Sequence, residues 1–263
     1  MNNKIFSLLS TLSFNSKQMP EALRLSENGV YESYYAPFEY INRTAKVVIC
    51  GITPGIQQAN IALATAQKEL AKGRTPDEVL KTAKHAASFA GPMRRNLASM
   101  LDHICLQEWL GIDSTAELFE SRKDLIHFTS ALRNPVFANG ANFSGGPAMV
   151  NNPYLWEMAK SGLTEEIRQL PGDAVYIPMG KGVDSVFERL IAEGMVGSDR
   201  VLFGLPHASG ANAERIAYFC GRKERDKLSL KTNPDSIDER RQSLQERVCQ
   251  LVSASRGLAV SSM

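Results

Sequence analysis

The sequence predicts an α/β fold with three layers, α/β/α, and a central parallel sheet of four strands. Two observations lead to this prediction. Apolar runs rich in β-branched residues recur along the chain, which is typical of strands buried on both faces. Segments with helical periodicity separate these runs, and strands that alternate with helices form parallel sheets. The expected strands are, in chain order, Val47–Cys50, Asp124–Ser130, Asp173–Met179 and Arg200–Phe203.

Glycine, proline and capping residues fix the ends of the expected helices. Gly73 ends the first helix, a Thr75–Glu78 capping box opens the second, and Pro92 opens the third. A further capping box stands at Ser236–Glu239. Between residues 133 and 152 we expect a long polar loop, and loops of that length are usually functional or mobile. The predicted helices cover about 56–72, 75–87, 92–109, 153–160 and 183–193, a helix that follows Asn212 and ends at Gly221, and a last helix from 236.

The length of 263 residues fits one large domain. We expect residues 1–45 to form an N-terminal extension that packs on the core, and residues 46–263 to form a single α/β domain. A helical insertion at about 56–88 interrupts that domain. The extension contains several tyrosines between positions 31 and 40. They either belong to a cover over the sheet edge or form a wall of the ligand cleft.

The composition excludes several classes of protein. Hydrophobic content of 43% and a net charge of +2 are ordinary for a globular chain and argue against disorder. No apolar run reaches the ~18 residues of a membrane span, and the first residues show no convincing cleavage site. The four cysteines form no CxxC pair, which argues against a zinc or iron–sulfur site. We therefore expect a cytoplasmic monomer without metal or cofactor.

Two glycine-bearing loops could carry chemistry. Gly51–Gly55 follows the first strand and contains Thr53, and Gly204–Asn212 follows the fourth and contains His207. The carboxyl ends of parallel strands share one edge of a sheet, so these loops should meet in a crevice. No Asp or Glu occurs from Tyr40 to Lys68, and this acid-free rim suits an anionic polymer. Phe89 and Ser130 follow other apolar elements, with basic residues nearby at Arg94, Arg95, Arg133 and Lys181.

These loops resemble the motifs of the uracil-DNA glycosylase superfamily over roughly residues 45–220. Gly51-Ile52-Thr53-Pro54-Gly55 resembles the first motif, closest to the mismatch-specific branch, whose middle residue is usually Asn. His207-Ala208-Ser209-Gly210 resembles the second motif, usually His-Pro-Ser or Asn-Pro-Ser-Gly. Phe89-Ala90-Gly91-Pro92 is similar to the Phe-Ala-x-Pro segment that stacks on the flipped base. Thr129-Ser130 falls where the superfamily often has an Asn that pairs with uracil.

The resemblance implies the uracil-DNA glycosylase fold and a monofunctional DNA glycosylase that leaves an abasic site without cutting the strand. Such an enzyme extrudes one nucleotide and hydrolyses its N-glycosidic bond. His207 would donate a hydrogen bond to the departing base, and Thr53 would position water. Base contacts would come from Gly51, Ile52, Pro54, Gly55, Phe89 and Ser130. DNA phosphates would contact Ser209, Gly210, Asn212, Arg94, Arg133 and Lys181.

The departures from the superfamily pattern point to an unusual substrate. The first motif has no carboxylate, which leaves an acid from elsewhere, Asp102 or Asp184, as the remaining option for a base. Ser130 cannot make the paired amide contact that selects uracil. Gly55 stands where uracil-specific enzymes have a bulky Tyr, and its missing side chain would leave room beside base C5. We expect a bulky or C5-modified pyrimidine, such as a modified cytosine of phage DNA in antiviral defence.

Three alternatives remain open. The chain could be a uracil or mismatch repair glycosylase. It could be a non-catalytic nucleic-acid-binding module, since Thr53 is a poor base. It could also be an α/β enzyme that acts on a free nucleoside or nucleotide, which would predict little dependence on salt.

Overall fold

The fold is built on a parallel sheet of three strands. The computed structural model describes residues 5, 8–9, 11–12, 14 and 18–261. β3 (Val47–Gly51) lies in the middle, with β4 (Ile126–Ser130) on one side and β7 (Val175–Pro178) on the other. Three of the predicted strands are thereby confirmed. The register places Gly51 beside Ser130, so the first glycine turn and the end of β4 are neighbours.

The predicted fourth strand is not formed as a strand. Only two isolated parallel bridges join this part of the chain to β7, at Tyr176–Val201 and Met179–Leu205. The backbone N–H of Leu202 donates to the Tyr176 carbonyl at 2.8 Å. Gly204, at φ +117°, then turns the backbone out of the extended region. Pro206 lacks an N–H, so the ladder cannot continue beyond it.

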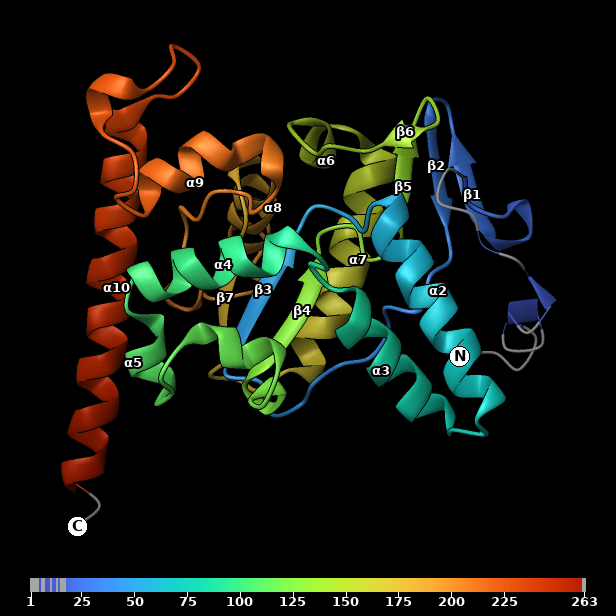
Figure 1. The fold of residues 1–263 in the computed structure, drawn as a ribbon, viewed down its shortest axis with the longest axis horizontal. Helices are drawn as coiled ribbons and strands as arrows, with labels where there is room; N and C mark the ends of the chain where they lie inside the picture. The colour runs from blue at the N-terminus through green and yellow to red at the C-terminus, as the bar shows by residue number, and fades with distance from the viewer. Residues whose placement is uncertain (1–4, 6–7, 10, 13, 15–17, 262–263) are drawn as a thin grey trace.

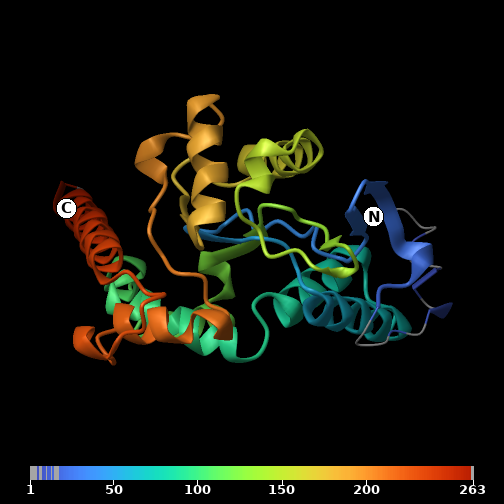
Figure 2. The same cartoon turned by 90° about the horizontal axis from the view of Figure 1, so that it is seen from above.

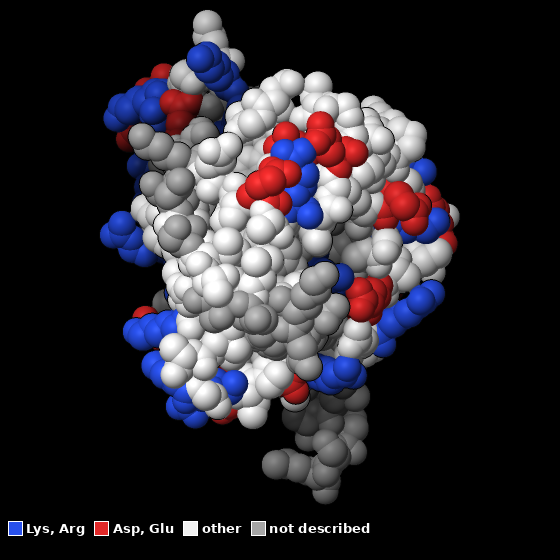
Figure 3. Space-filling view, turned by 90° about the vertical axis from the view of Figure 1, so that its right-hand side faces the viewer, with Lys and Arg blue, Asp and Glu red and all other residues white. Residues whose placement is uncertain are grey.

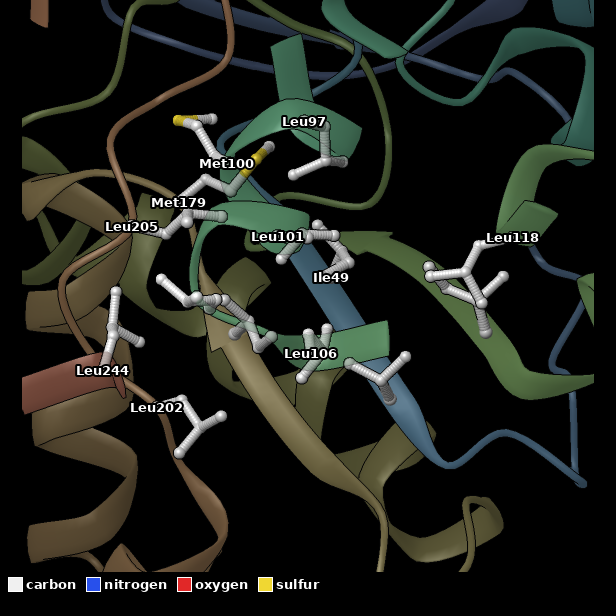
Figure 4. Packing of buried hydrophobic residues seen from close by; sticks show 14 of the residues in the cluster. Ile49, Leu97, Met100, Leu101, Leu106, Leu118, Met179, Leu202, Leu205 and Leu244 are labelled. Atoms are coloured by element: carbon white, nitrogen blue, oxygen red, sulfur yellow. The ribbon is translucent and has the colours of Figure 1, made fainter. Parts of the chain in front are cut away.

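Helices cover both faces of the sheet (Figures 1 and 2). One face carries α4 (Pro92–His103), α5 (Leu106–Leu110), α9 (Ala213–Phe219) and α10 (Pro234–Ser261). The other carries α6 (Ala148–Asn151), α7 (Pro153–Gln169) and α8 (Lys181–Ala192). Alternate residues of β3 point to opposite faces of the sheet. Ile49 packs under α4 (Figure 4), whereas Val48 belongs to the cluster below α7 and α8. Both sides of β3 are thus buried, which explains its continuous apolar run.

A second, antiparallel sheet was not predicted. It joins β1 (Arg24–Asn28), β2 (Tyr31–Tyr34), β5 (Val136–Ala138) and β6 (Ala141–Asn142) in that order. The expected long loop at 133–152 was therefore wrong, because it contains β5, β6 and α6. Strands of three and two residues are too short to show an alternating pattern. The N-terminal hairpin thus joins strands from the middle of the chain.

The tyrosine-rich segment is part of a cover. Tyr34, Tyr35 and Phe38 are buried in one cluster with α2 (Ile56–Ala71) and α3 (Pro76–Ala87). The capping box predicted for α3 is present, with the Thr75 hydroxyl accepting from the Glu78 N–H and the Glu78 carboxylate accepting from the Thr75 N–H. On the face of the molecule that this region occupies, acidic and basic side chains lie in small mixed groups (Figure 3). Among the described residues of that face, no large field of one sign is visible.

Several helix ends differ from the prediction. The helix expected from Pro92 to Trp109 is broken at Cys105, whose φ of +61° separates α4 from α5. The last helix begins at Pro234 rather than Ser236, because the Asn233 side chain accepts from the Ser236 N–H at 3.1 Å. α7 runs on to Gln169, since tertiary packing overrides the weak helix propensity of Gly162. Within the described residues no helix has the length and apolar character needed to span a membrane.

Candidate active site

A cleft of about 780 Å³ opens at the carboxyl ends of the parallel strands. Its walls come from the turn Gly51–Gly55, the β7–α8 turn, the segment Gly204–Asn212 and the segment Asn142–Gly146. None of the described residues that line the cleft is acidic. Four lining residues are basic: Lys181, Arg215, Lys231 and Arg240. The cleft therefore favours an anionic ligand.

His207 lines this cleft as a neutral hydrogen-bond donor. Its Nδ1 accepts the backbone N–H of Ser209 at 3.2 Å, which places the ring proton on Nε2. Burial lowers the pKa of His207, so the ring is neutral at pH 7. The loop is fixed from α4 by the Asn96 side chain, which donates to the Ala208 carbonyl at 2.9 Å. The imidazole is thus held in one tautomer before any ligand binds.

Thr53 has a structural task within the same cleft. Its hydroxyl donates to the Asn134 carbonyl at 2.9 Å and accepts the Val136 N–H at 3.0 Å. These bonds tie the first glycine turn to β5, which a sequence pattern could not indicate. One oxygen lone pair remains to accept a hydrogen bond from water. Thr53 could orient a water through that lone pair but has no proton left to donate.

The space expected beside Gly55 is occupied. Asn142 of β6 presents its carboxamide at 3.5 Å from where a Cβ of Gly55 would stand. The same Asn142 oxygen accepts the Ile56 N–H at 2.9 Å, and so takes one of the donors at the start of α2. The predicted opening beside Gly55 was therefore wrong, because a residue distant in the chain fills it.

Phe89 closes the floor of the cleft in a strained conformation. The backbone of Phe89 has a φ of +50°, which lies in the left-handed region. A bulky side chain occupies that region at a cost of roughly 1–3 kcal/mol. Its ring packs edge-on against Phe128 with centroids 5.5 Å apart. A Cβ on Gly51 would lie 3.2 Å from the ring, so glycine permits this close approach.

Arg94 holds the Phe89 loop in place instead of binding phosphate. Its guanidinium donates to the carbonyls of His85, Ala86 and Ser88 at 2.6–3.1 Å. It also lies over the Phe119 ring, 5.4 Å from the centroid. Because these contacts direct Arg94 to the C-terminal end of α3, the phosphate role predicted for it has no support in the structure.

Beneath Phe89 lies a second space of about 20 Å³, which we call the inner chamber. Phe89 and Ser130 line both the cleft and the inner chamber and so separate them. The volume admits about one water molecule. The chamber is lined by Phe38, Pro54, Gln58, Lys84, Ser88, Phe89, Phe128, Thr129, Ser130 and Arg133.

A buried ionic cluster borders the inner chamber. Lys84 of α3 is 3% exposed and donates to the Tyr40 carbonyl at 2.7 Å. Burial lowers the pKa of Lys84 to about 8, against the opposing effect of Glu166. Burial alone would raise the pKa of Glu166, but Lys84 and a hydrogen bond from His127 lower it to about 2. Lys84 and Glu166 are thus both charged at pH 7.

His127 completes this cluster as a neutral ring. Burial, together with Lys84, lowers its pKa to about 4. Its Nε2 donates to Glu166 at 3.1 Å, while its Nδ1 accepts the Asn42 N–H at 3.3 Å. Sequence reasoning missed all three members, since Lys84 and Glu166 look like ordinary polar positions of amphipathic helices. The one available signal was His127 within an apolar strand.

Most of the predicted site residues meet at the cleft. Arg133 instead lines the inner chamber, where it pairs with Glu165 at 3.1 Å and lies 3.8 Å from Glu166, and these contacts give the predicted phosphate role no support. Pro54 also lines the chamber, and Gly210 lines neither space. The cleft contains Gly51, Ile52, Thr53, Gly55, Phe89, Ser130, Lys181, His207, Ser209 and Asn212.

The two acids considered as alternative bases lie outside the cleft lining. Asp102 caps the turn at Thr115, accepting from its N–H at 2.7 Å. Asp184 is buried and pairs with Arg240 at 2.7 Å. Burial raises the pKa of Asp184 to about 6, although Arg240 opposes this. Arg240 therefore stands between Asp184 and the cleft.

The C-terminal wall of the cleft was also missed. It comprises residues that follow the second motif, namely Arg215, Lys231, Asn233, Ser236, Ile237 and Arg240. The net basic character of residues 222–231 was the available signal. The wall exists because α9 packs against the start of α10, where the Tyr218 hydroxyl donates to the Asp238 carboxylate at 2.7 Å.

Comparison with known proteins finds one informative similarity. The chain is 36% identical over 237 residues to "Uncharacterized protein YoxB" of Bacillus subtilis (strain 168). The alignment covers 89% of this chain and 92% of that protein. No protein-family model and no solved structure matches the chain.

Proposed function

The chain belongs to the family of the Bacillus subtilis protein YoxB, and we propose that it is a DNA glycosylase that releases a bulky or C5-modified pyrimidine. The observation that carries the proposal is His207, a neutral Nε2–H donor fixed by the Ser209 N–H in an acid-free cleft. The motif resemblance around Gly51–Gly55 and His207–Gly210 supports the same function. The two parallel bridges at Val201 and Leu205 support the four-stranded sheet of the superfamily.

The proposed reaction breaks the bond between C1′ of the sugar and the base nitrogen. The bonding electron pair leaves with the base, and the sugar carries the developing positive charge. His207 Nε2–H would donate to the base oxygen on which negative charge collects. Water then adds to C1′ and loses a proton to solvent. Because the water meets a cationic carbon, the cleft needs only to orient it, and Thr53 offers one acceptor lone pair for that purpose.

The size and charge of the cleft support an extended substrate. Its volume of about 780 Å³ lies toward the upper end of the roughly 300–1,000 Å³ typical of small-molecule pockets. A modified base with its sugar would use more of that space than a plain base. Lys181, exposed at the start of α8, would contact a DNA phosphate. The inner chamber would take part of the base only if Phe89 moved.

A base-release assay tests the proposal. The protein is incubated with oligonucleotides that carry uracil, mismatched thymine, hydroxymethylcytosine or glucosylated hydroxymethylcytosine, single- or double-stranded, and abasic sites are then cleaved with alkali. We expect a product band with a modified cytosine. Loss of one preorganised donor lowers such rates by about 10²–10³, so His207→Ala should nearly abolish the band. The control His103→Ala, at the far end of α4, should retain it.

A non-catalytic nucleic-acid-binding module is the second candidate. One observation favours it: none of the described residues lining the cleft is a carboxylate, and the Thr53 hydroxyl is largely used by β5. Such a module would release no base from any oligonucleotide. It would still bind DNA with steep salt dependence, and Lys181→Ala would reduce the salt slope by about one. This combination would overturn the glycosylase proposal.

A further inference from the structure

One basic residue of the cleft has an acidic partner inside the protein. Among the described basic residues that line the cleft, Arg240 is the one that forms an ion pair. Its Nη1 donates to Oδ2 of Asp184 at 2.7 Å. The Arg240 side chain is 32% exposed, whereas the Asp184 side chain is 3% exposed. Arg240 therefore connects a buried carboxylate with the cleft.

The close approach of two chain segments places Arg240 at this position. Gly204 also lines the cleft, and a Cβ on it would lie 3.0 Å from Cβ of Arg240 and 3.2 Å from the Arg240 carbonyl oxygen. The φ of Gly204, +117°, is likewise one that residues with a side chain rarely adopt. Asp184 lies in the first turn of α8. α8 and α10 thus meet beside the cleft, with Arg240 in its lining and Asp184 outside it.

The charge of Asp184 depends on Arg240. Within the described part of the chain, Oδ1 of Asp184 has no hydrogen-bond partner, and Oδ2 accepts from Arg240. Burial raises the pKa of Asp184 to about 6, although Arg240 opposes this. The other charged groups that act on it belong to α8 itself: Glu188 raises the pKa and Lys181 lowers it. Asp184 is therefore ionised at pH 7 with Arg240 beside it, and loss of that partner would raise its pKa further.

A phosphate in the cleft would compete with Asp184 for the Arg240 guanidinium. A guanidinium binds phosphate through two parallel N–H···O bonds, and the described lining of the cleft contains no acid that would compete for it. The phosphate would also bring negative charge toward Asp184. Both effects disfavour the carboxylate, and a buried acid that loses its cation becomes neutral by binding a proton.

We propose that Arg240 leaves Asp184 to bind a phosphate of the DNA strand in the cleft, and that Asp184 takes up a proton from solvent as this happens. The proton binds a carboxylate oxygen, so the buried acid becomes neutral while the guanidinium gains a new anionic partner. The inference rests on the part of the proposed function that places a DNA strand in the cleft, and it does not require base release. Binding should weaken as the pH rises, because proton uptake then becomes less favourable.

Calorimetry with oligonucleotides that carry a tetrahydrofuran abasic analogue, single- and double-stranded, tests the proposal without turnover. Binding enthalpies at pH 7 in Tris and in PIPES, which differ in their own enthalpy of protonation, give the number of protons taken up. The wild-type protein should take up about 0.5–1 proton more than Asp184→Asn, whose amide cannot be protonated. Between pH 6.5 and pH 7.5 the affinity of the wild-type protein relative to Asp184→Asn should fall about three- to tenfold.

Three further variants sharpen the comparison. Arg240→Gln should bind DNA more weakly and lose the extra proton uptake, because an unpaired Asp184 is already neutral in the free protein. The double variant Asp184→Asn/Arg240→Gln has no charge at either position and should bind as Arg240→Gln does. The control is Glu193→Gln, because Glu193 pairs with Arg189 at 3.1 Å at the other end of α8, outside the cleft lining. This control should retain the proton uptake of the wild-type protein.

Proton uptake and base release are measured separately. If no base is released from any oligonucleotide but the wild-type protein still takes up more protons than Asp184→Asn, the proposed catalysis fails and the exchange of partners by Arg240 stands. Base release together with equal proton uptake by the two proteins would overturn the exchange and leave the proposed function intact. If neither form of the oligonucleotide binds at any pH, the exchange is overturned as well.

Discussion

Phe89 and Ser130 form a partition between the cleft and the inner chamber, and the two spaces differ in whether their charged side chains are paired. In the cleft, the basic Lys181 and Lys231 are exposed and face a lining without acids. In the inner chamber, the buried Lys84 is balanced by Glu166, and Arg133 lies beside the same carboxylate. A solvated charge needs no partner within the protein and is therefore free to bind a ligand. A charge removed from water must be paired within the protein. We therefore expect the chamber to control stability and the cleft to control binding.

The largest expected effect on the free energy of unfolding comes from removing one charge of the ionic cluster beside the inner chamber. Lys84→Met removes the buried cation whose charge stabilises the Glu166 carboxylate and leaves Arg133, 3.8 Å away, as its charged neighbour. Loss of one partner of a direct buried pair costs about 3–5 kcal/mol, and because Arg133 stays near Glu166 we expect a loss of about 2–3 kcal/mol. Urea unfolding should report a decrease of that size in the free energy of unfolding.

Two further variants sharpen this test. Lys81→Met lies on the exposed face of the same helix and should change stability by less than about 0.5 kcal/mol. The double variant Lys84→Met/Glu166→Leu should recover part of the loss, since it removes both charges. If Lys84→Met lowers the free energy of unfolding no more than Lys81→Met does, the stability of the protein does not depend on charge pairing beside the inner chamber.

The next effect is acid destabilisation of the same cluster. The folded pKa values of His127, about 4, and Glu166, about 2, lie below those of the unfolded chain, so the unfolded chain binds more protons in acid. Their stabilising contribution is complete above about pH 6.5 and is lost as the pH falls through the folded values. The contribution of these two groups, measured by urea titration as the difference between the wild-type protein and a variant without the His127 ring, should decrease by about 2–3 kcal/mol between pH 7 and pH 4. The raised pKa of Asp184 acts in the opposite direction in both proteins and cancels in that difference.

A variant identifies the residue responsible. His127→Gln should flatten the pH dependence between about pH 6.5 and pH 4, because the titrating ring is gone. If the free energy of unfolding of that variant depends on pH as steeply as that of the wild-type protein, other groups cause the acid sensitivity.

The smallest effect on stability concerns the partition itself. Gly51→Ala would place a Cβ 3.2 Å from the Phe89 ring and 3.6 Å from the Ser130 hydroxyl. The displaced ring should lower the free energy of unfolding by about 1–2 kcal/mol. Under the proposed function base release should also fall, since Phe89 would be displaced from its place in the cleft lining. Gly162→Ala on α7 meets no atom within 4 Å and should be neutral or stabilising by up to about 1 kcal/mol. Equal stability and activity of the two variants would show that the partition tolerates displacement.

Local patterns predicted the elements whose signals are local. The apolar run at Val47–Cys50, the capping box at Thr75–Glu78 and the glycine turns all lie where expected, because each depends on neighbours within a few residues. The meeting of Thr53, Ser130 and His207 at one edge was also predictable, whereas Phe89, in the loop between α3 and α4, follows no strand. This meeting follows from parallel strands alone, whose carboxyl ends must share an edge.

Other features depend on pairs of residues far apart in the chain. Arg133 could be recognised as basic, but only the packing of α7 beside β4 assigns it to Glu165 and Glu166 rather than to a phosphate. Asn142 fills the space beside Gly55 only because β6 joins a sheet with the N-terminal hairpin. Neither partner carries a local signal of the other.

The sequence by itself thus determined the mixed α/β class, the strand–turn–helix units and the edge at which the site forms, since hydrophobic period and turn chemistry act over short distances. Tertiary structure decided which charges are free and which are paired, and what space the glycines leave. These properties depend on burial and on contacts between distant residues, and the free energy of a charge or a cavity is set by what surrounds it in space.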